Sequence, residues 1–353
     1  MRRRTMARGR APTVKDVAEH AGVSPGVVSR VVNANGSVSE RTRERVLASI
    51  KALDYRPHSA ARELRTRTTN TIGLVLADVA NPFFAHLAEH VVRHAAEVGL
   101  GVLLTTTQED PAMELRSIEL LMQKRVRGVI AAPGTGNAAA WRHMRDLGID
   151  LTFVDRVIDR IPGIDVVGMD NESAAHAATT ALLERGHRRI ALVSGPSTTS
   201  TGHERIDGYR RALDEHDVAA DPALVAELAF QRAGVENAVR AMAGLDEPPT
   251  ALIVGNTAVS AHVVRYLQEC GVRLPEDLSV VVFHDAEWTT LMTPQITVVR
   301  HQLDDLARTA VEMLHSRMNS DEPLRRREIR LDSELVIRSS LAPPRKRRAL
   351  LNT

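Results

Sequence analysis

The sequence has 353 residues, of which 43% are hydrophobic and 25% are charged, and its formal net charge is +2. A chain of this length can bury two or three cores without a disulfide framework, and its single cysteine, Cys270, is typical of a reducing compartment. No run of eighteen apolar residues occurs, and the basic start lacks the apolar stretch of a signal peptide. The composition therefore predicts a cytoplasmic protein that is neither exported nor membrane-spanning.

Charge is distributed unevenly along the chain. Residues 1–67 contain 15 Lys and Arg against 6 Asp and Glu, whereas the remaining 286 residues contain 31 against 38. A basic head on an acidic body is typical of nucleic-acid binding confined to one end of a protein. The two ends, residues 1–11 and 342–353, are predicted to be a basic disordered arm and a basic disordered tail.

Residues 12–57 begin with the pattern of two short helices. Thr13, with Asp16 three residues later, predicts the start of the first helix. A glycine ends that helix, and Ser24 then caps a second helix that has Pro25 at its first position. Two short helices joined by a tight turn are typical of a helix-turn-helix, which places the start of its second helix at base edges in the major groove.

A third helix is predicted to begin at Ser39. Val46, Leu47, Ile50 and Leu53 fall on its inner face, and its arginines fall on the outer face. Other small three-helix packings can mimic this pattern, so the helices alone leave DNA binding open.

The segment that follows, residues 58–69, is predicted to be a hinge helix and linker. Its amphipathic part is too short to be stable as a lone helix in water, so it needs a partner surface. Three stretches around it occur in a fixed order: VKDVAEHAGVSPGVVSRVVN, VSERTRERVLASIKALDYRPHSAARELRT and TNTIGLVLADVANPFF. In sequence and spacing they resemble the lactose/galactose repressor (LacI/GalR) family of bacterial transcription regulators.

The resemblance implies a DNA-binding headpiece in residues 12–57. Where relatives usually have Gly and Asn, this chain has Asp54 and His58, which tolerate a left-handed backbone and donate a hydrogen bond, respectively. In such proteins, hinge helices from two protomers pack in the minor groove, and Leu64 matches the leucine wedged into the central base step. The residues that the resemblance assigns to DNA are Lys15, Ser24, Pro25, Gly26, Val27, Ser29, Arg30, Asn33, Tyr55, His58, Ala61 and Leu64.

Residues 70–341 have an α/β pattern. Apolar strand-like runs alternate with helical stretches, which predicts parallel sheets covered by helices: TIGLVLA, GVLLTT, GVIAA, LTFV, RIALVS, TALIV and SVVVF. The resemblance divides this region into a two-lobed, periplasmic-binding-protein-like core. Lobe 1 is predicted at about 70–154 plus 301–325, and lobe 2 at about 155–300 plus 326–341.

A small-molecule effector is expected in the cleft between the lobes, at the carboxyl ends of the strands. Arg205 is the strongest candidate, because a guanidinium can clamp a hydroxyl pair or a carboxylate. The alternative for this residue is a salt bridge to Glu204 or Asp207. By resemblance, the effector residues are Phe83, Gly134, Thr135, Arg205, Phe230, Asn256, His284 and His301.

The histidines of this predicted pocket depart from the family pattern. His284 stands where relatives have a carboxylate, and His203 and His301 are also predicted near the cleft. Imidazoles that titrate near neutral pH would suit a carboxylated or phosphorylated ligand. A neutral imidazole can equally serve a neutral sugar.

The sequence also predicts what the protein lacks. His86, His90 and His94 share one helical face, but core residues adjoin them, so we expect no metal site. No nucleophile, base and orienting acid share a catalytic motif, so we expect neither an enzyme nor a cofactor.

The predicted protein is therefore a homodimeric repressor. It would bind near-palindromic double-stranded operator DNA and respond to an effector. A solute-binding protein would fit the core alone, and a sugar-metabolising enzyme is the second alternative; the headpiece argues against both.

Overall fold

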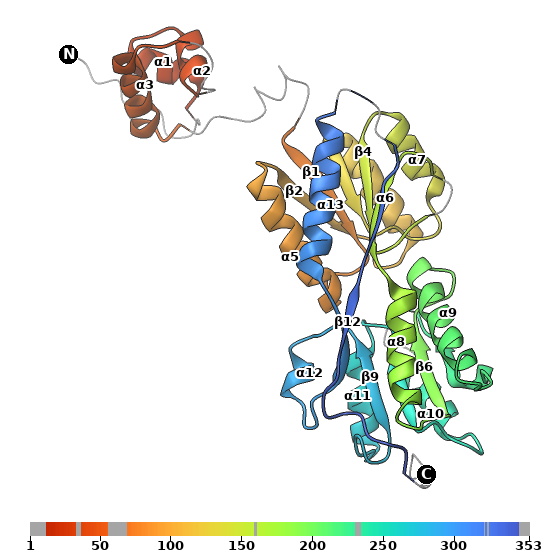
Figure 1. The fold of residues 1–353 in the computed structure, drawn as a ribbon. Coiled ribbons are helices and arrows are strands. Elements are labelled where there is room, and N and C mark those ends of the chain that lie inside the picture. The colour runs from red at the N-terminus through yellow and green to blue at the C-terminus, as the bar shows by residue number, and fades with distance from the viewer. Residues whose placement is uncertain are drawn as a thin grey trace. The chain divides into compact units, whose positions relative to one another are not determined.

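A computed structural model of the chain describes residues 12–32, 37–55, 69–158, 161–229, 234–320, 322 and 325–345. The chain divides into two compact units, Met1–Thr69 and Asn70–Thr353, which we describe separately (Figure 1). Several predictions fall outside the described residues: those for the arm 1–11, Asn33, His58, Ala61, Leu64, Phe230 and the tail beyond residue 345.

The first unit contains three helices within its described residues: α1 (Val14–Ala21), α2 (Pro25–Val32) and α3 (Glu40–Ala52). The predicted start of α1 is confirmed. The backbone N–H of Thr13 donates to Asp16 Oδ2 at 2.7 Å, and the N–H of Asp16 donates to Thr13 Oγ1 at 3.4 Å. Gly22, with φ of 63°, ends the helix in the left-handed conformation that glycine adopts without strain.

The core of this unit corrects the predicted inner face of α3. Val46 is buried against α1 and α2, but Leu47 is 51% exposed, and Ser49 takes the inner position. The Ser49 hydroxyl lies 2.8 Å from the carbonyl oxygen of Arg45 and 3.0 Å from His20 Nδ1. A serine is tolerated in this buried position because its hydroxyl is hydrogen-bonded. The residue type alone did not indicate that Ser49 would face inward.

The second unit consists of two lobes, and within the described residues each lobe has a six-stranded sheet; the first is parallel throughout, and the second is parallel except for β12. The first sheet has the order β11-β5-β4-β3-β1-β2 and the second β12-β10-β9-β8-β6-β7. The elements of lobe 1 are β1 (Thr71–Leu76), α5 (Pro82–Glu97), β2 (Gly101–Thr106), α6 (Pro111–Gln123), β3 (Gly128–Ala131), α7 (Ala138–Asp146), β4 (Asp150–Val154), β5 (Asp165–Met169), α13 (Leu303–Met318) and β11 (Glu328–Leu331). Those of lobe 2 are α8 (Asn171–Leu183), β6 (Ile190–Ser194), α9 (Ser200–Asp214), a 3-10 helix (Pro222–Leu224), β7 (Val225–Glu227), α10 (Val235–Ala243), β8 (Ala251–Val254), α11 (Ser260–Glu269), β9 (Ser279–Phe283), α12 (Trp288–Leu291), β10 (Thr297–His301) and β12 (Ser333–Val336).

The chain crosses between the lobes at Asp170, Gln302 and Asp332, each a single residue between two elements. The crossing at Gln302 agrees with the predicted boundary near 301, whereas those at Asp170 and Asp332 lie beyond the predicted boundaries near 155 and 326. The strand β5 was not predicted, and it pairs with β4 and β11 and so extends the sheet of lobe 1. The backbone N–H of Asp170 donates to the carbonyl of Leu331 at 2.9 Å, which ties two of the crossings together.

Helices cover both faces of each sheet. In lobe 1, α5 and α13 pack on one face, and α6 and α7 on the other, around the buried Trp141 and Phe153. In lobe 2, α8 and α9 pack on one face of the sheet, with Tyr209 of α9 buried between them and the strands. The helices α10 and α11 pack on the opposite face. Among the described residues, no helix combines the length and the apolarity that crossing a membrane requires.

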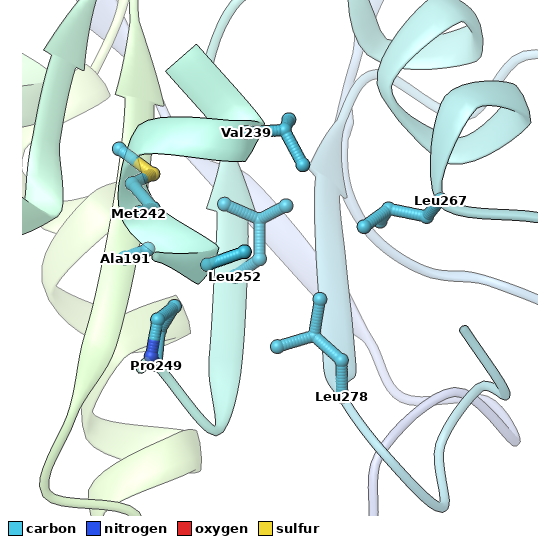
Figure 2. Close-up of a pocket in the computed structure, with 8 residues that line it drawn as sticks. Ala191, Val239, Met242, Pro249, Leu252, Leu267 and Leu278 are labelled. Carbon is cyan, nitrogen blue, oxygen red and sulfur yellow. The ribbon is translucent and has the colours of Figure 1, made fainter. Parts of the chain in front are cut away.

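A small apolar hollow lies beside α10 and α11. Figure 2 shows Val239, Met242, Leu252, Leu267 and Leu278 around it. Its volume is about 20 Å³, which is no more than a water molecule occupies, and its lining is almost entirely apolar. We therefore regard it as a packing gap between helices and sheet rather than a binding site.

The end of the described chain is docked on lobe 2 rather than disordered from residue 342. The carbonyl oxygen of Ala342 lies 2.9 Å from His187 Nε2, and its N–H donates to Ser279 Oγ at 3.0 Å. The segment around Ser340 and Ala342 is therefore packed on lobe 2, because the backbone groups of these two residues find partners there.

A buried carboxylate joins three segments of lobe 1. Asp165 is fully buried and accepts hydrogen bonds from the side chains of Arg317 and Arg327 and from the Arg327 backbone at 2.9 Å. Burial acts to raise the pKa of Asp165, but the hydrogen bonds from the two arginines hold it below its ordinary value. The start of β5, the end of α13 and the segment before β11 thus share one charged group.

Replacing Asp165 by Asn should lower the free energy of unfolding of the core by about 3 kcal/mol, because two guanidinium groups lose their buried counter-charge. Urea unfolding followed by tryptophan fluorescence measures this, since Trp141 is buried in the same lobe. The control is Asp146→Asn, which removes an exposed ion pair with Arg145 and should change stability by less than about 0.5 kcal/mol. Equal losses in the two variants would contradict the assigned role of Asp165.

Candidate functional site

The start of α2 presents a small, open surface. Ser24, Pro25, Gly26 and Arg30 are exposed. A Cβ atom built on Gly26 would meet only Ser24 Oγ, at 3.9 Å, so another molecule can approach the backbone closely here. This matches what a helix entering the major groove requires.

The other described headpiece candidates are placed less uniformly. Lys15 is exposed, while Val27 and Ser29 are half-buried. Tyr55 lies instead in the core of the unit, where burial raises the pKa of its hydroxyl. Asp54 has a φ of 44°, the left-handed conformation that the sequence analysis expected it to tolerate.

In the second unit, residues from both lobes line a hollow of about 20 Å³ at the carboxyl ends of the strands, and unlike the gap of Figure 2 its lining includes charged and polar side chains. Lobe 1 contributes Asn81, Phe83, Phe84, Asp155 and Arg156, and lobe 2 contributes Thr201, Arg205 and Thr257. A ligand between parallel sheets binds at this edge because the strands end there and helix N-termini begin.

Arg205 is buried in the wall of this hollow. Its Nε donates to Asn171 Oδ1 at 2.9 Å, its Nη1 donates to the carbonyl of Gly255, and its Cζ lies 4.7 Å from the centre of the Phe283 ring. Burial lowers the pKa of Arg205 to about 10, so the group still carries its charge at neutral pH. The salt bridge considered from sequence does not form, since Glu204 pairs with Arg330 and Asp207 with His203.

Lobe 1 places a carboxylate in the same hollow. Asp155 follows β4 with a φ of 65°, and burial raises its pKa. Its neighbour Arg156 forms a two-point ion pair with Glu109, with both N–O distances 2.8 Å. Asp155 and Arg156 were not predicted as site residues, although a charged pair directly after the apolar run TFV marks the carboxyl end of a strand.

An aromatic cluster forms the next part of the cleft. The Phe83 ring centre lies 6.0 Å from that of His284 and 5.9 Å from that of His301, both edge to face. His301 Nδ1 lies 2.9 Å from Ser333 Oγ, whereas Nε2 of both histidines is buried without a hydrogen-bond partner among the described residues. Unpartnered buried nitrogens at a cleft are available to a ligand.

The charge state of these histidines corrects the predicted one. Burial, together with the nearby His86, lowers the pKa of His284 to about 4. Burial and the Arg205 charge hold the pKa of His301 well below its ordinary value. His203 is 65% exposed and lies 3.1 Å from Asp207 of its own helix. The imidazoles of His284 and His301 are therefore neutral at physiological pH.

Two larger hollows flank this cluster. One, of about 220 Å³, is lined by Gly134 and Thr135 in lobe 1 and by Thr198 and Thr199 in lobe 2. The N–H of Gly134 donates to the buried carboxylate of Glu114 at 2.8 Å, which fixes this turn. The other hollow, of about 240 Å³, is lined by His86, His90, His284, Asp285, Arg300, His301, Leu303 and Asp304.

The structure thus divides the effector candidates. Phe83 and Arg205 share the central hollow, Gly134 and Thr135 share a second, and His284 and His301 share a third. Asn256 is fully buried and shapes the turn before α11, since its amide donates to the carbonyl of Leu228 at 3.2 Å.

The histidines of α5 form ion-paired contacts. His94 Nε2 lies 2.7 Å from Asp304, and His94 Nδ1 lies 3.1 Å from Glu97. No group of three or more His, Cys, Asp or Glu side chains in the described part of the chain has the geometry to hold a metal ion.

Comparison with known proteins gives two family matches and many relatives. Residues 13–58 match the family described as bacterial regulatory proteins, lacI family, and residues 179–341 match the periplasmic binding protein-like domain. The chain is 30% identical over 339 residues to the HTH-type transcriptional repressor PurR of Aliivibrio salmonicida, covering 93% of this chain and 98% of that protein. It is 32% identical to the ribose operon repressor of Halalkalibacterium halodurans, covering 93% and 96%.

Two solved structures resemble the chain over nearly its whole length. The lac repressor dimer bound to operator and the anti-inducer ONPF has a TM-score of 0.83 at 25% identity, covering 94% of this chain and 99% of that one. The complex of the transcriptional regulator CelR with cellobiose has a TM-score of 0.71 at 28% identity, covering 93% and 99%.

The lowered pKa of His284 predicts a pH-dependent stability. A histidine with a lower pKa in the folded state stabilises the fold fully above its ordinary pKa, and this contribution is lost as the pH falls toward the folded value. His284 should therefore cost about 2 kcal/mol of stability at pH 5 relative to pH 8. In His284→Asn, which keeps a residue that tolerates the φ of 77°, that part of the pH dependence should disappear.

Urea unfolding at a series of pH values measures the difference between the wild-type protein and His284→Asn. The exposed His203→Asn is the matched control and should follow the wild type. The assignment of a neutral, buried imidazole fails if His284→Asn and the wild type keep parallel pH profiles between pH 8 and pH 5.

Proposed function

The chain belongs to the LacI family of bacterial regulatory proteins, and from this premise we propose how its two units act together. It is a DNA-binding transcriptional regulator rather than an enzyme, and a small-molecule effector bound to the core controls its affinity for operator DNA. The observation that carries the proposal is the joint presence of an open α2 surface and a cleft lined by polar groups from both lobes. Access to DNA places the protein in the cytoplasm.

On DNA, the headpiece is proposed to insert α2 into the major groove. Pro25 and Gly26 approach the base edges, and Arg30 contacts the phosphate backbone, with Lys15 and Ser29 beside it. Leu64 of the hinge segment is proposed as the wedge in the minor groove. The lac repressor dimer, which this chain resembles in structure, is bound to operator, and this supports operator binding by the present chain.

The protein is proposed to act as a homodimer, for which the surface of lobe 1 gives support. The edge strand β2 exposes Leu104, the adjoining helices α5 and α6 expose Val92 and Leu115, and Val98 is exposed directly after α5. Apolar side chains grouped around an unpaired edge strand are typical of a surface that another chain covers. The lac repressor structure is itself a dimer.

The effector is proposed to be an uncharged, hydroxyl-rich molecule such as a sugar. The histidines that suggested an anionic ligand are neutral, and the buried Arg205 is matched across the cleft by Asp155. The neighbouring hollow adds the acidic group of Asp110, beside Glu109, whose charge is already paired with Arg156. Hydroxyl groups can donate to a carboxylate and accept from a guanidinium, so one neutral ligand would satisfy both fixed charges.

The effector acts through the lobe angle in this proposal. A ligand that contacts Asp155 and Arg205 from opposite lobes favours the arrangement in which both contacts form. The resulting change in the separation of lobe 1 between protomers would fold or release the hinge segments on DNA. The ligand can shift this equilibrium only by its different affinity for the two arrangements.

Calorimetric titration with neutral sugars, sugar acids and sugar phosphates tests the ligand class. We expect binding of a neutral sugar and none of the anionic compounds. Arg205→Lys should weaken that binding at least tenfold, at roughly 1.4 kcal/mol per factor of ten, because a point charge cannot replace the guanidinium fork. Arg211→Lys, an exposed position on the same helix, is the control. Binding of anionic compounds alone would overturn the neutral assignment.

Arg30→Ala should weaken binding to DNA fragments selected by the wild-type protein from random sequence. We expect a dissociation constant about threefold to tenfold higher, and a slope of log affinity against log salt smaller by about one, because one phosphate contact is lost. Electrophoretic mobility shifts at several salt concentrations measure both. Arg265→Ala, an exposed arginine of lobe 2, should change neither value. An unchanged slope for Arg30→Ala would remove Arg30 from the phosphate contacts.

A further inference from the structure

One ion pair joins the two lobes beside the central hollow. Glu204 lies on α9 of lobe 2 and Arg330 on β11 of lobe 1, and the Arg330 Nη1 to Glu204 Oε1 distance is 2.8 Å. The two side chains are 20% and 34% exposed, so the pair is partly shielded from water. Because it spans the lobes, it can persist only in lobe arrangements close to this one.

The second oxygen of Glu204 connects this pair to the effector site. Asn171 Nδ2 donates to Glu204 Oε2 at 3.1 Å, and Asn171 Oδ1 accepts from Arg205 Nε at 2.9 Å. The orientation of the amide is fixed, since its oxygen faces a guanidinium and its nitrogen faces a carboxylate. A flipped amide would oppose donor to donor and acceptor to acceptor.

Asn171 also lies at the hinge itself. It is the first residue of α8, directly after the crossing at Asp170, and its Nδ2 lies 3.2 Å from the carbonyl of Met169, the last residue of β5. The same buried amide therefore contacts the effector-site arginine, the carboxylate of the interlobe pair and the strand that leads into the hinge.

Both partners keep other contacts when the pair separates. Arg330 also pairs with Glu328 on its own strand, with an Nη2 to Oε1 distance of 3.1 Å, and Glu204 keeps Asn171. Neither charge is left without a partner, so breaking the pair costs far less than breaking an isolated buried one. Two lobe arrangements of similar free energy are then accessible, as a switch requires.

We propose that Glu204 is a positioning residue that couples the effector site to the hinge. Through Asn171, the position of Arg205 sets the position of the Glu204 carboxylate, and with it the strength of the interlobe pair with Arg330. An effector that draws Arg205 away from Asn171 weakens the pair and shifts the lobes from the present arrangement to the one in which the effector contacts both Asp155 and Arg205. This inference rests on the proposed effector site and adds the residues that transmit its occupancy.

Spin-label distances between the lobes test the inference without DNA or effector. The native Cys270 is first replaced by Ser. One label then replaces the exposed Arg142 on α7, and the other replaces the exposed Gln268 on α11. An excess of unlabelled protein ensures that each dimer contains at most one labelled protomer. The distance distribution reports two populations, one at the interlobe distance of the present arrangement and one at a second distance. Glu204→Gln and Arg330→Gln should each raise the ratio of the second population to the first by about threefold to fivefold, the range expected for a partly exposed ion pair.

Conservative and matched variants separate a lost interaction from a damaged fold. Arg330→Lys keeps the charge and should restore a distribution closer to the wild type than Arg330→Gln does. Glu172→Gln is the control, because it breaks a pair with Arg211 that joins α8 and α9 within lobe 2. It should leave the interlobe distances unchanged.

The link through Asn171 is tested by combining substitutions. Arg205→Lys alone should also raise the ratio of the second population to the first, because it removes the Nε donor to Asn171. Combined with Arg330→Gln, it should add nothing, since both act on one pair. Additive shifts, or unchanged distances in Glu204→Gln and Arg330→Gln, would overturn the inference. Such a result would leave the proposed DNA and effector binding intact, because neither ligand enters the measurement.

Discussion

The architecture of the core depends on three single-residue crossings between two sheets. Asp170, Gln302 and Asp332 each separate an element of one lobe from an element of the other, so no connecting segment is long enough to let the lobes drift apart. The hydrogen bond from the Asp170 N–H to the carbonyl of Leu331 ties two crossings together. The lobes can therefore move relative to each other mainly by rotation about these crossings, so the angle between the lobes largely determines the geometry of the cleft.

That constraint makes the charged groups of the cleft sensitive to the angle between the lobes. Asp155 and Arg205 lie on opposite sides of the central hollow, whereas Glu204 and Arg330 form an ion pair between the lobes. Asp155 has a counter-charge in its own lobe, since Arg156 Nε lies 3.8 Å from its carboxylate, but the Glu204 carboxylate takes its counter-charge from the other lobe. Since the Glu204–Arg330 pair forms best at one hinge angle, any molecule that competes for one partner acts on that angle. Ligand recognition and lobe movement therefore involve the same few side chains.

Much of the fold could be predicted from local sequence, and the failures share one cause. The capping residues of α1 and the alternation of strands and helices depend on neighbouring residues, and the structure has them as predicted. Leu47 was predicted to face inward, but Ser49 is buried instead, because the packing of α3 against two other helices decides which residue faces inward. The strand β5 was missed because its five residues become a strand only by pairing with β4 and β11. Both errors concern contacts between segments distant in the chain.

The candidate site could be located from the sequence, but its chemistry could not. Family resemblance pointed to Arg205, His284 and His301, and these side chains do lie at the cleft. Residue type suggested a cationic pocket, because an exposed imidazole titrates near neutral pH. Burial favours the neutral alternative, since the charged form loses its hydration, and His86 and Arg205 further disfavour a charge on His284 and His301, respectively. Desolvation is a property of the assembled fold, so the charge of these imidazoles depends on packing that residue type does not show.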